Sequence, residues 1–310
     1  MNKLKRSWTL FKCSVSVVLQ NKKLLVFPAL SFVFTMIILF LAITPVAFQS
    51  TGYKLDQGAH WKAVGSSLFA TKSIAQGESS TTKVTFKPLA IGIGVGIYML
   101  AMFLATFFNV AFFHQILHAL KGDPVSVQGG FKFAVSKLKA IALWSLFAGL
   151  IGLIIKVLEE RLEAVGRLIM RFVGLAWSVA SVFVIPVLIV EPGSNPIEVL
   201  RKSAATLKKT WGESLAGYLG LQFGRLLVVL CSIMFLGGAL VASIVTRNGW
   251  ILLSGVVLWV FALIAFAYLT SVAGQVYRCA LYIYAAEGAI PQPYNDELLQ
   301  MAWKLKKAWA

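Results

Sequence analysis

The chain has 310 residues, of which 58% are hydrophobic and only 13% are charged, and its mean hydropathy is +0.80. Soluble domains carry roughly 25% charged residues, so this composition excludes an ordinary soluble fold and indicates a chain embedded in a lipid bilayer. The net charge of +17 would also suit a nucleic-acid-binding protein. A membrane protein, however, gains such an excess from the Lys and Arg of its cytosolic loops, and we expect no nucleic-acid partner.

Six apolar segments have the length, or nearly the length, of about 20 residues that a helix needs to cross the hydrocarbon core. The first follows a basic N-terminus and lacks a small-residue cleavage site at its end, so we expect it to stay in the protein as an uncleaved span. The second, fifth and sixth are long enough to tilt or to project beyond the bilayer. In chain order, the predicted spans are residues 24–48, 88–118, 139–157, 170–190, 215–246 and 249–283.

The fold class predicted by these segments is all-α, a polytopic membrane helical bundle that forms one integral domain over residues 1–310. Of the 29 Lys and Arg, 18 lie on the same side of the predicted spans as the N-terminus and 10 lie on the opposite side, while Arg225 falls inside a span. Because cytosolic loops are enriched in Lys and Arg, this bias predicts that both termini are cytosolic. The predicted location is the cytoplasmic membrane.

A basic stretch with one apolar face precedes each outward-going span, and a fourth such stretch closes the chain. The stretches are residues 5–20, 128–138, 196–211 and 295–309. The apolar faces of the first three are Trp8, Phe11, Val15 and Val18; Phe131, Val135 and Leu138; and Leu200, Ala204, Leu207 and Trp211. Such amphipathic helices suit the headgroup region, where basic residues meet anionic lipid. The chain is thus predicted to contain three units, each an interfacial helix followed by a transmembrane hairpin.

The segment between the first two spans, residues 49–87, is rich in Gly, Ser, Thr and Lys, and we expect an extracytosolic surface loop and not a catalytic domain. The second outer loop carries acidic and basic residues in a cluster that is typical of a solvated helix face. The cluster consists of Glu159, Glu160, Glu163, Arg161, Arg167 and Arg171.

Several patterns that resemble functional motifs have simpler structural explanations. Gly92, Gly94 and Gly96 lie inside a predicted span and lack the strand context of a dinucleotide fingerprint, so we expect helix packing at Gly92 and Gly96. His114 and His118 share one helix face but lack a third ligand nearby, which favours polar anchoring over a metal site. Three cysteines without paired spacing are expected to be small buried residues: Cys13, Cys231 and Cys279. We expect no cofactor and no metal.

The most informative residues are polar side chains inside or beside the spans. A cation within a span is costly without a partner, so Arg225 marks a functional or pairing position. The predicted topology places Arg225 in the cytosolic half of the bilayer. Other polar residues lie at a similar depth and form a candidate polar layer with it. These are Asn109, Gln222, Gln275 and, at the end of the fourth span, Glu191. The layer could be a structural network that joins helices, a cytosol-open pocket for an anionic headgroup, or part of a translocation path.

Several longer motifs resemble a family of multi-span prokaryotic membrane proteins known only as a domain of unknown function. They include Phe108-Asn109-Val110-Ala111, residues 183–191 with the following 200–204, residues 210–214, and residues 280–288. The resemblance covers nearly the whole chain except residues 49–87. The chain is more distantly similar to the membrane portions of some glycerophosphodiester phosphodiesterases, but it has no soluble phosphodiesterase domain. The resemblance therefore implies a topology and no reaction.

With no catalytic set in the sequence, we expect a non-enzymatic membrane protein that acts as a lipid-associated scaffold or partner subunit. Its expected partners are membrane lipids, anionic at the cytosolic face, together with unidentified proteins. The alternative is a transporter or lipid-handling protein that uses a pocket around Arg225. A weaker third reading is a membrane enzyme that acts on lipid headgroups. A sealed and fully paired polar layer would argue against both pocket readings.

Overall fold

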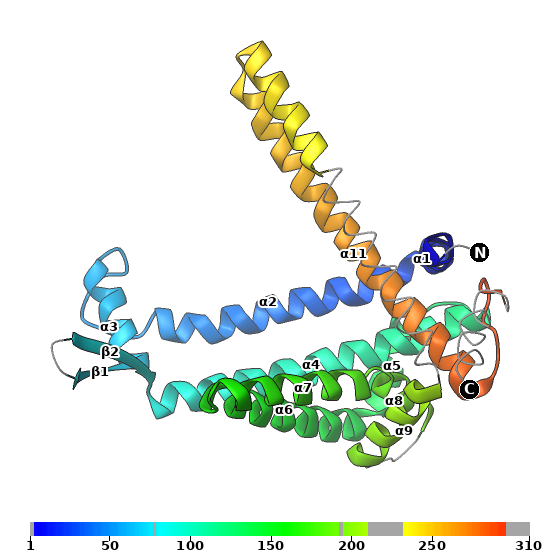
Figure 1. Ribbon diagram of the computed structural model, residues 1–310, viewed down its shortest axis with the longest axis horizontal. Helices are drawn as coiled ribbons and strands as arrows, with labels where there is room; N and C mark the ends of the chain where they lie inside the picture. Colours follow the sequence, from blue (N-terminus) through cyan, green and yellow to red (C-terminus); the bar gives the residue numbers. More distant parts are fainter. Residues whose placement is uncertain (1–2, 77–78, 192–194, 210–231, 296–310) are drawn as a thin grey trace.

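The computed structural model describes residues 3–76, 79–191, 195–209 and 232–295, and most of these residues are helical (Figure 1). Five helical segments among them are long and apolar enough to cross a membrane: Lys22–Ala47, Ala90–Lys121, Leu138–Arg161, Ala164–Val190 and Gly249–Glu287. The predicted all-α bundle with several spans is therefore confirmed. The predicted span 215–246 is described only by the apolar helix Ser232–Thr246, and the rest of it lies outside the described residues.

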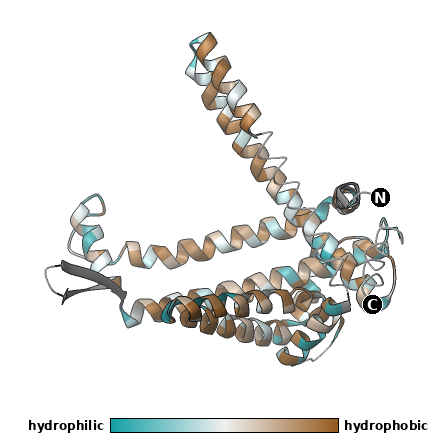
Figure 2. Ribbon diagram, in the orientation of Figure 1, coloured by the Kyte–Doolittle hydropathy of each residue, from teal (hydrophilic) through white to brown (hydrophobic). Residues whose placement is uncertain are grey.

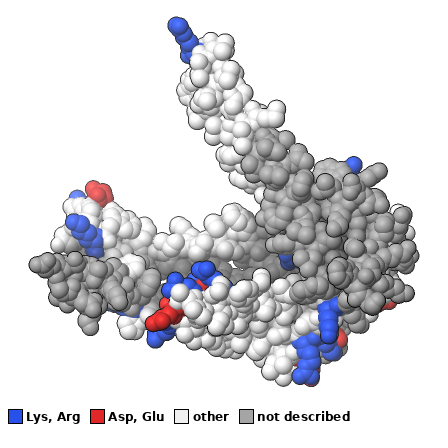
Figure 3. All heavy atoms as spheres, viewed as in Figure 1, with Lys and Arg blue, Asp and Glu red and all other residues white. Residues whose placement is uncertain are grey.

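The centre of the bundle is α4 (Pro88–Lys121), which contacts α2 (Val26–Ala47) on one side and α6 (Leu138–Arg161) on another, while α7 (Ala164–Ala180) packs on α6. These helices are apolar along most of their length (Figure 2), many of their large apolar side chains are exposed, and charged side chains gather toward their two ends (Figure 3). This is the surface that a bilayer requires, because hydrocarbon solvates apolar side chains and excludes charges.

Glycine positions show where helices approach most closely. A Cβ added at Gly149 or Gly152 of α6 would lie 2.7–2.8 Å from Met99 or Tyr98 of α4, so these two glycines admit the neighbouring helix. Gly92 and Gly96 have nothing within 4 Å of an added Cβ. The packing role predicted for that pair is therefore wrong within the described chain, because the small-residue contact between α4 and its neighbour occurs at the α6 glycines instead.

Three shorter helices lie at one end of the bundle, which we call the α1 end: α1 (Lys3–Gln20), α5 (Val127–Ser136) and α9 (Pro196–Lys209) (Figure 1). These correspond to the first three predicted basic stretches; the fourth, from residue 296 onward, lies outside the described residues. The faces that they bury in protein are mostly offset from the predicted apolar faces. The buried residues are Leu10, Ser14, Val17 and Val18; Gly130 and Ala134; and Val199, Ser203 and Leu207.

On α5 and α9, small buried residues explain this offset, because they let a short helix pack closely on a neighbour. Gly130 lies against the Phe27 ring and the backbone oxygen of Ala111. Val135 and Leu138, which belong to the predicted apolar face of α5, are instead exposed. Asn195 Oδ1 accepts a hydrogen bond from the backbone N–H of Ile197 at 3.2 Å, so α9 begins at Pro196 with an Asn cap, the residue type that helix N-termini prefer.

The predicted span 170–190 is not one continuous helix. The helix α7 ends at Ala180, a turn follows, and α8 (Val184–Val190) continues the path with Pro186 buried. Ser203 of α9, which is fully buried, holds this turn: its hydroxyl donates to Ala180 O at 2.6 Å and accepts from the Phe183 backbone N–H at 3.0 Å. A side chain from a distant helix therefore replaces the backbone hydrogen bonds that the break removes.

Residues 49–87 form secondary structure and are not an irregular loop. The helix α3 (Gly58–Leu68) leads into an antiparallel hairpin of β1 (Phe69–Gln76) and β2 (Ser79–Phe86), paired from Phe69–Phe86 to Gln76–Ser79. His60 is 2% exposed and bonds the Thr51 hydroxyl at 2.6 Å and Ala47 O, at the end of α2, at 2.8 Å. This small cap therefore closes the bundle at the end opposite α1 (Figure 1).

The last long helix, α11 (Gly249–Glu287), has two different halves. Its C-terminal half, from Val272 onward, is buried against α1, α4 and α9 at the α1 end. Its N-terminal half forms a helical hairpin with Ser232–Thr246 that points away from the rest of the bundle (Figure 1). Large apolar side chains cover the outside of this hairpin, among them Met234, Val245 and Phe261.

Candidate functional site

The strongest candidate site is a pocket of about 270 Å³ between α2, α4 and α11. It brings together two residues of the predicted polar layer, Asn109 and Gln275. Each stands twelve residues before the end of its helix, Lys121 for α4 and Glu287 for α11. At a rise of 1.5 Å per residue, each amide lies about 18 Å of helix from that end, and the depth that the two share in the bilayer stays a prediction.

The wall contributed by α2 was not predicted. It is formed by the first three turns of that helix, where apolar rings and small hydroxyl groups alternate: Phe27, Pro28, Ser31, Phe32 and Thr35. Phe108 and Phe112 of α4 complete the lining beside Asn109. No sequence motif described above pointed to this wall.

The two amide groups of the pocket are available to a ligand as far as the described chain is concerned. Within that part of the chain, neither Asn109 nor Gln275 makes a side-chain hydrogen bond to protein, and both side chains are partly exposed. The Thr35 hydroxyl, by contrast, bonds the Ser31 backbone oxygen at 2.8 Å. An amide offers both donors and acceptors, so the pair suits the carbonyl and hydroxyl groups of a bound molecule.

The remaining members of the predicted layer do not join this pocket in the described structure. Glu191 forms an ion pair with Lys202 of α9 and lies at the end of α8, away from the pocket lining. Both partners are partly exposed, so this pair contributes little stability, roughly 0–1 kcal/mol. Arg225 and Gln222 lie outside the described residues.

Packing around the pocket is dense on the α4 side. The Phe27 ring stacks on Phe112 with ring centroids 5.8 Å apart, and it also contacts Phe131 of α5 at 5.6 Å. At the same end of α2, the Tyr268 hydroxyl of α11 donates a hydrogen bond to Leu25 O. The start of α2 is thereby held against α4, α5 and α11, and the pocket is preformed.

The histidine pair is a structural cluster. His114 stacks on Phe133, with ring centroids 3.8 Å apart, and His118 Nδ1 lies 3.1 Å from Asp123 Oδ2. Gln115, which a metalloprotease motif would require to be Glu, accepts the backbone N–H of Ser126 at 2.7 Å. The described residues contain no group of three or more His, Cys, Asp or Glu placed to hold a metal ion.

The acidic and basic residues at the other end of α6 and α7 pair with one another, as a solvated face does. Arg171 Nε lies 3.2 Å from Glu159 Oε1, and Lys156 Nζ lies 3.4 Å from Glu160 Oε1. Of the cysteines, Cys279 is buried and Cys13 is partly buried, both as free thiols, while Cys231 lies outside the described residues.

The model of a family of unknown function, DUF6159, matches residues 91–291 of the chain. The match includes every element that lines the pocket except α2. No curated protein matches the chain, and no solved structure matches it.

Proposed function

Since the chain belongs to DUF6159, a family of unknown function, we propose from its own geometry that it is a lipid-binding protein of the cytoplasmic membrane. Part of one lipid molecule occupies the pocket between α2, α4 and α11. The observation that carries this proposal is the preformed pocket itself, in which two amides without a described partner face four phenyl rings.

The chemistry of the lining suits the boundary region of a lipid. Its rings accept acyl chain or glycerol carbon, and the amides of Asn109 and Gln275 match ester carbonyl and hydroxyl groups. Its volume of about 270 Å³ lies just below the range of pockets for drug-sized ligands, roughly 300–1,000 Å³. The pocket therefore holds a segment of a lipid, while the rest of the molecule stays in the bilayer.

The short helices at the α1 end support the location and orientation. The α5 helix exposes Val135 beside Lys132, and α9 exposes Ile197 beside Arg201 and Lys202. Exposed apolar and basic side chains on one helix are typical of contact with anionic headgroups. We propose that this end faces the cytosol and that both termini lie there.

Replacing both pocket amides with Leu should strongly reduce retention of the bound lipid. Leu branches at the same carbon as Asn and is larger than either amide side chain, so Asn109→Leu with Gln275→Leu removes two hydrogen bonds without opening the pocket. We expect about a tenfold fall in the lipid that remains on the purified protein after a detergent wash, measured by mass spectrometry.

Gln128→Leu is the matched control, because Gln128 is an exposed amide of α5 outside the pocket lining. It should retain lipid like the unchanged protein. Equal lipid species and amounts in all three proteins would contradict the proposal.

The orientation is tested by labelling introduced cysteines in intact cells. In a background without native cysteines, Lys62→Cys on α3 should react with a membrane-impermeant maleimide, while Lys132→Cys on α5 should react only after the cells are opened. Both positions are exposed on the protein, so accessibility depends on the side of the membrane. Labelling of Lys132→Cys in intact cells would reverse the proposed orientation.

The second candidate function is a non-enzymatic scaffold or partner subunit. The observation that favours it is the helical hairpin of Ser232–Thr246 and the first half of α11, which exposes apolar side chains along its length and points away from the bundle. Such a hairpin has surface for a second membrane protein. The two functions are compatible, since the pocket and the hairpin occupy different parts of the chain.

A further inference from the structure

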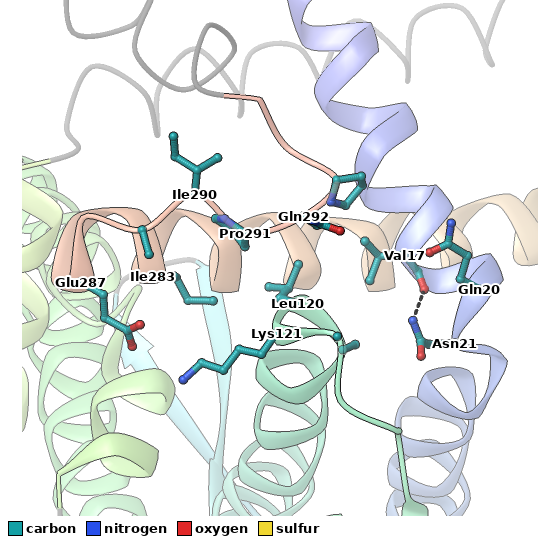
Figure 4. Close-up of a pocket in the computed structure, with 14 residues that line it drawn as sticks. Val17, Gln20, Asn21, Leu120, Lys121, Ile283, Glu287, Ile290, Pro291 and Gln292 are labelled. Atoms are coloured by element: carbon teal, nitrogen blue, oxygen red, sulfur yellow. Dashed lines mark hydrogen bonds between the residues drawn. The ribbon is translucent and has the colours of Figure 1, made fainter.

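A second and larger cavity, of about 600 Å³, lies at the α1 end, where three helices end beside one another. Its walls are the last residues of α1, α4 and α11 and the segment from Ala289 to Pro293 that follows α11 (Figure 4). It shares no lining residue with the Asn109 pocket. Along the chain, buried core residues separate the linings of the two cavities. Leu24 lies between Asn21 and Phe27, and Ile116 lies between Phe112 and Ala119.

The segment after α11 is a fixed wall. Tyr294, which is buried, shares a 2.7 Å hydrogen bond with the Ser14 hydroxyl of α1, and its backbone N–H donates to Pro291 O at 2.9 Å. The Cys13 thiol approaches Pro293 O at 3.8 Å. Burial raises the pKa of Tyr294 well above its usual range, so its hydroxyl stays uncharged and keeps this bond. The cavity is therefore present before any ligand binds.

Two opposite charges line this cavity. Lys121 ends α4 and Glu287 ends α11, and Figure 4 shows their side chains extending toward one another beside Ile283. Both residues are exposed, and within the described chain neither is part of an ion pair. Side chains of opposite charge in one cavity, not paired with each other, leave room for a ligand between them.

The helix ends add a negative potential. The last carbonyl groups of a helix point out of its C-terminus without intrahelical partners and carry roughly half a negative charge in total. The cavity is lined by three such ends, at Gln20, Lys121 and Glu287, where backbone N–H groups cap some of the carbonyls and the others keep the negative potential. A simple anion is attracted by Lys121 but repelled by Glu287 and these carbonyls, and a simple cation is attracted by Glu287 but repelled by Lys121.

We propose that this cavity binds a zwitterionic group, with a primary ammonium at Glu287 and the helix ends and a phosphate or carboxylate at Lys121. The amides of Gln20 and Gln292 offer further hydrogen bonds, as does the amide oxygen of Asn21, whose Nδ2 donates to Val17 O at 3.1 Å, and Val17, Leu120 and Ile290 contact the short carbon linker. Two sources present this chemistry: the headgroup of an aminophospholipid and a free amino acid. This site is additional to the Asn109 pocket.

The test is the selectivity of lipid retention by the full chain. Protein purified in detergent is incubated with an equimolar mixture of phosphatidylethanolamine and phosphatidylglycerol, and bound lipid is quantified by native mass spectrometry. We expect phosphatidylethanolamine to be preferred about tenfold, and Glu287→Gln to remove this preference, because a charge-assisted hydrogen bond is lost. The same lipid retention is also measured in a protein that carries Asn109→Leu and Gln275→Leu. Because these changes weaken binding in the Asn109 pocket, the remaining preference reports on this cavity.

Matched and reversed variants complete the design. Glu198→Gln changes an exposed carboxylate of α9 outside the lining and should keep the preference. Lys121→Glu combined with Glu287→Lys should restore it, because a zwitterion can bind in the opposite orientation. All these residues are exposed, so the variants should fold, and an unchanged melting temperature checks this.

The source of the zwitterion follows from a second measurement. A rise in melting temperature with phosphoethanolamine, together with selective lipid retention, identifies a lipid headgroup. A rise with glycine or serine that disappears in Glu287→Gln, without lipid selectivity, identifies a free amino acid. Equal retention of both lipids with no thermal effect of any zwitterion overturns the proposal, as does a preference that Glu287→Gln leaves intact.

Discussion

Replacing Ser203 with Ala should destabilise the protein by on the order of 3 kcal/mol. The Ser203 hydroxyl satisfies two backbone groups at the turn between α7 and α8: the Ala180 oxygen and the Phe183 N–H. Phe183 is fully buried, so water does not replace the lost partner. A buried donor without a partner costs about 1–3 kcal/mol, and this substitution also removes the side-chain partner of the part-buried Ala180 oxygen.

The measurement is thermal unfolding of the purified protein in detergent, followed by tryptophan fluorescence, since Trp177 lies one turn before this break. Ser178→Ala is the control: its hydroxyl bonds Gly174 O within the same helix and the residue is exposed, so we expect a change within about 0.5 kcal/mol. Equal unfolding temperatures for the two variants would show that the Ser203 bonds do not stabilise the turn.

Gly130→Ala should also destabilise, although alanine is the better helix former by about 1 kcal/mol. An added Cβ would lie 2.8 Å from Phe27 Cζ and 3.0 Å from Ala111 O, and neither atom has room to retreat. Phe27 is 1% exposed and packed between Phe112 and Phe131. Forcing such a contact in a packed core costs about 1–3 kcal/mol. Because Phe27 also lines the Asn109 pocket, lipid retention should fall as well.

Gly94→Ala provides the opposite case on α4. Its added Cβ meets nothing within 4 Å, so this substitution should stabilise by up to about 1 kcal/mol through helix propensity alone. Unfolding temperature and bound lipid are measured on both variants. The Gly130→Ala protein should unfold at a lower temperature than the unchanged protein, and the Gly94→Ala protein at an equal or higher one. A stabilised Gly130→Ala protein would mean that α5 shifts freely against Phe27.

Much of the bundle could be predicted from hydropathy and charge. Apolar runs long enough to cross the hydrocarbon core predicted the spans that contain Phe40, Phe103 and Leu146. The predicted basic stretch 196–211 begins where α9 begins, at Pro196. These features depend on local sequence, which is why the sequence alone reveals them.

Features that depend on distant partners were missed. The break at residues 181–183 is completed by Ser203, twenty residues or more along the chain, and no local signal in an apolar run marks it. The α3 helix and the β hairpin of residues 58–86 are short and polar, so composition favoured a loop. The buried faces of α5 and α9 centre on Gly130, Ala134 and Ser203, whereas the sequence pattern weighted the larger apolar side chains.

The candidate site was predicted in part. Asn109 and Gln275 were grouped by the depth that the predicted topology gave them, and both line one pocket. The α2 wall of that pocket depends on tertiary packing, so Ser31 and Thr35 had no signal of their own. The second cavity was not predicted either, because it arises where three helix ends converge from distant parts of the sequence.

The attachment of α2 at both of its ends bears on how fast a ligand exchanges. His60 holds Ala47 at one end, and the Tyr268 hydroxyl holds Leu25 at the other. A helix fixed twice does not swing like a gate, so the α2 wall keeps its place while a ligand enters and leaves through the open side of the pocket. Weakening either anchor should loosen this wall and quicken the exchange of a bound ligand.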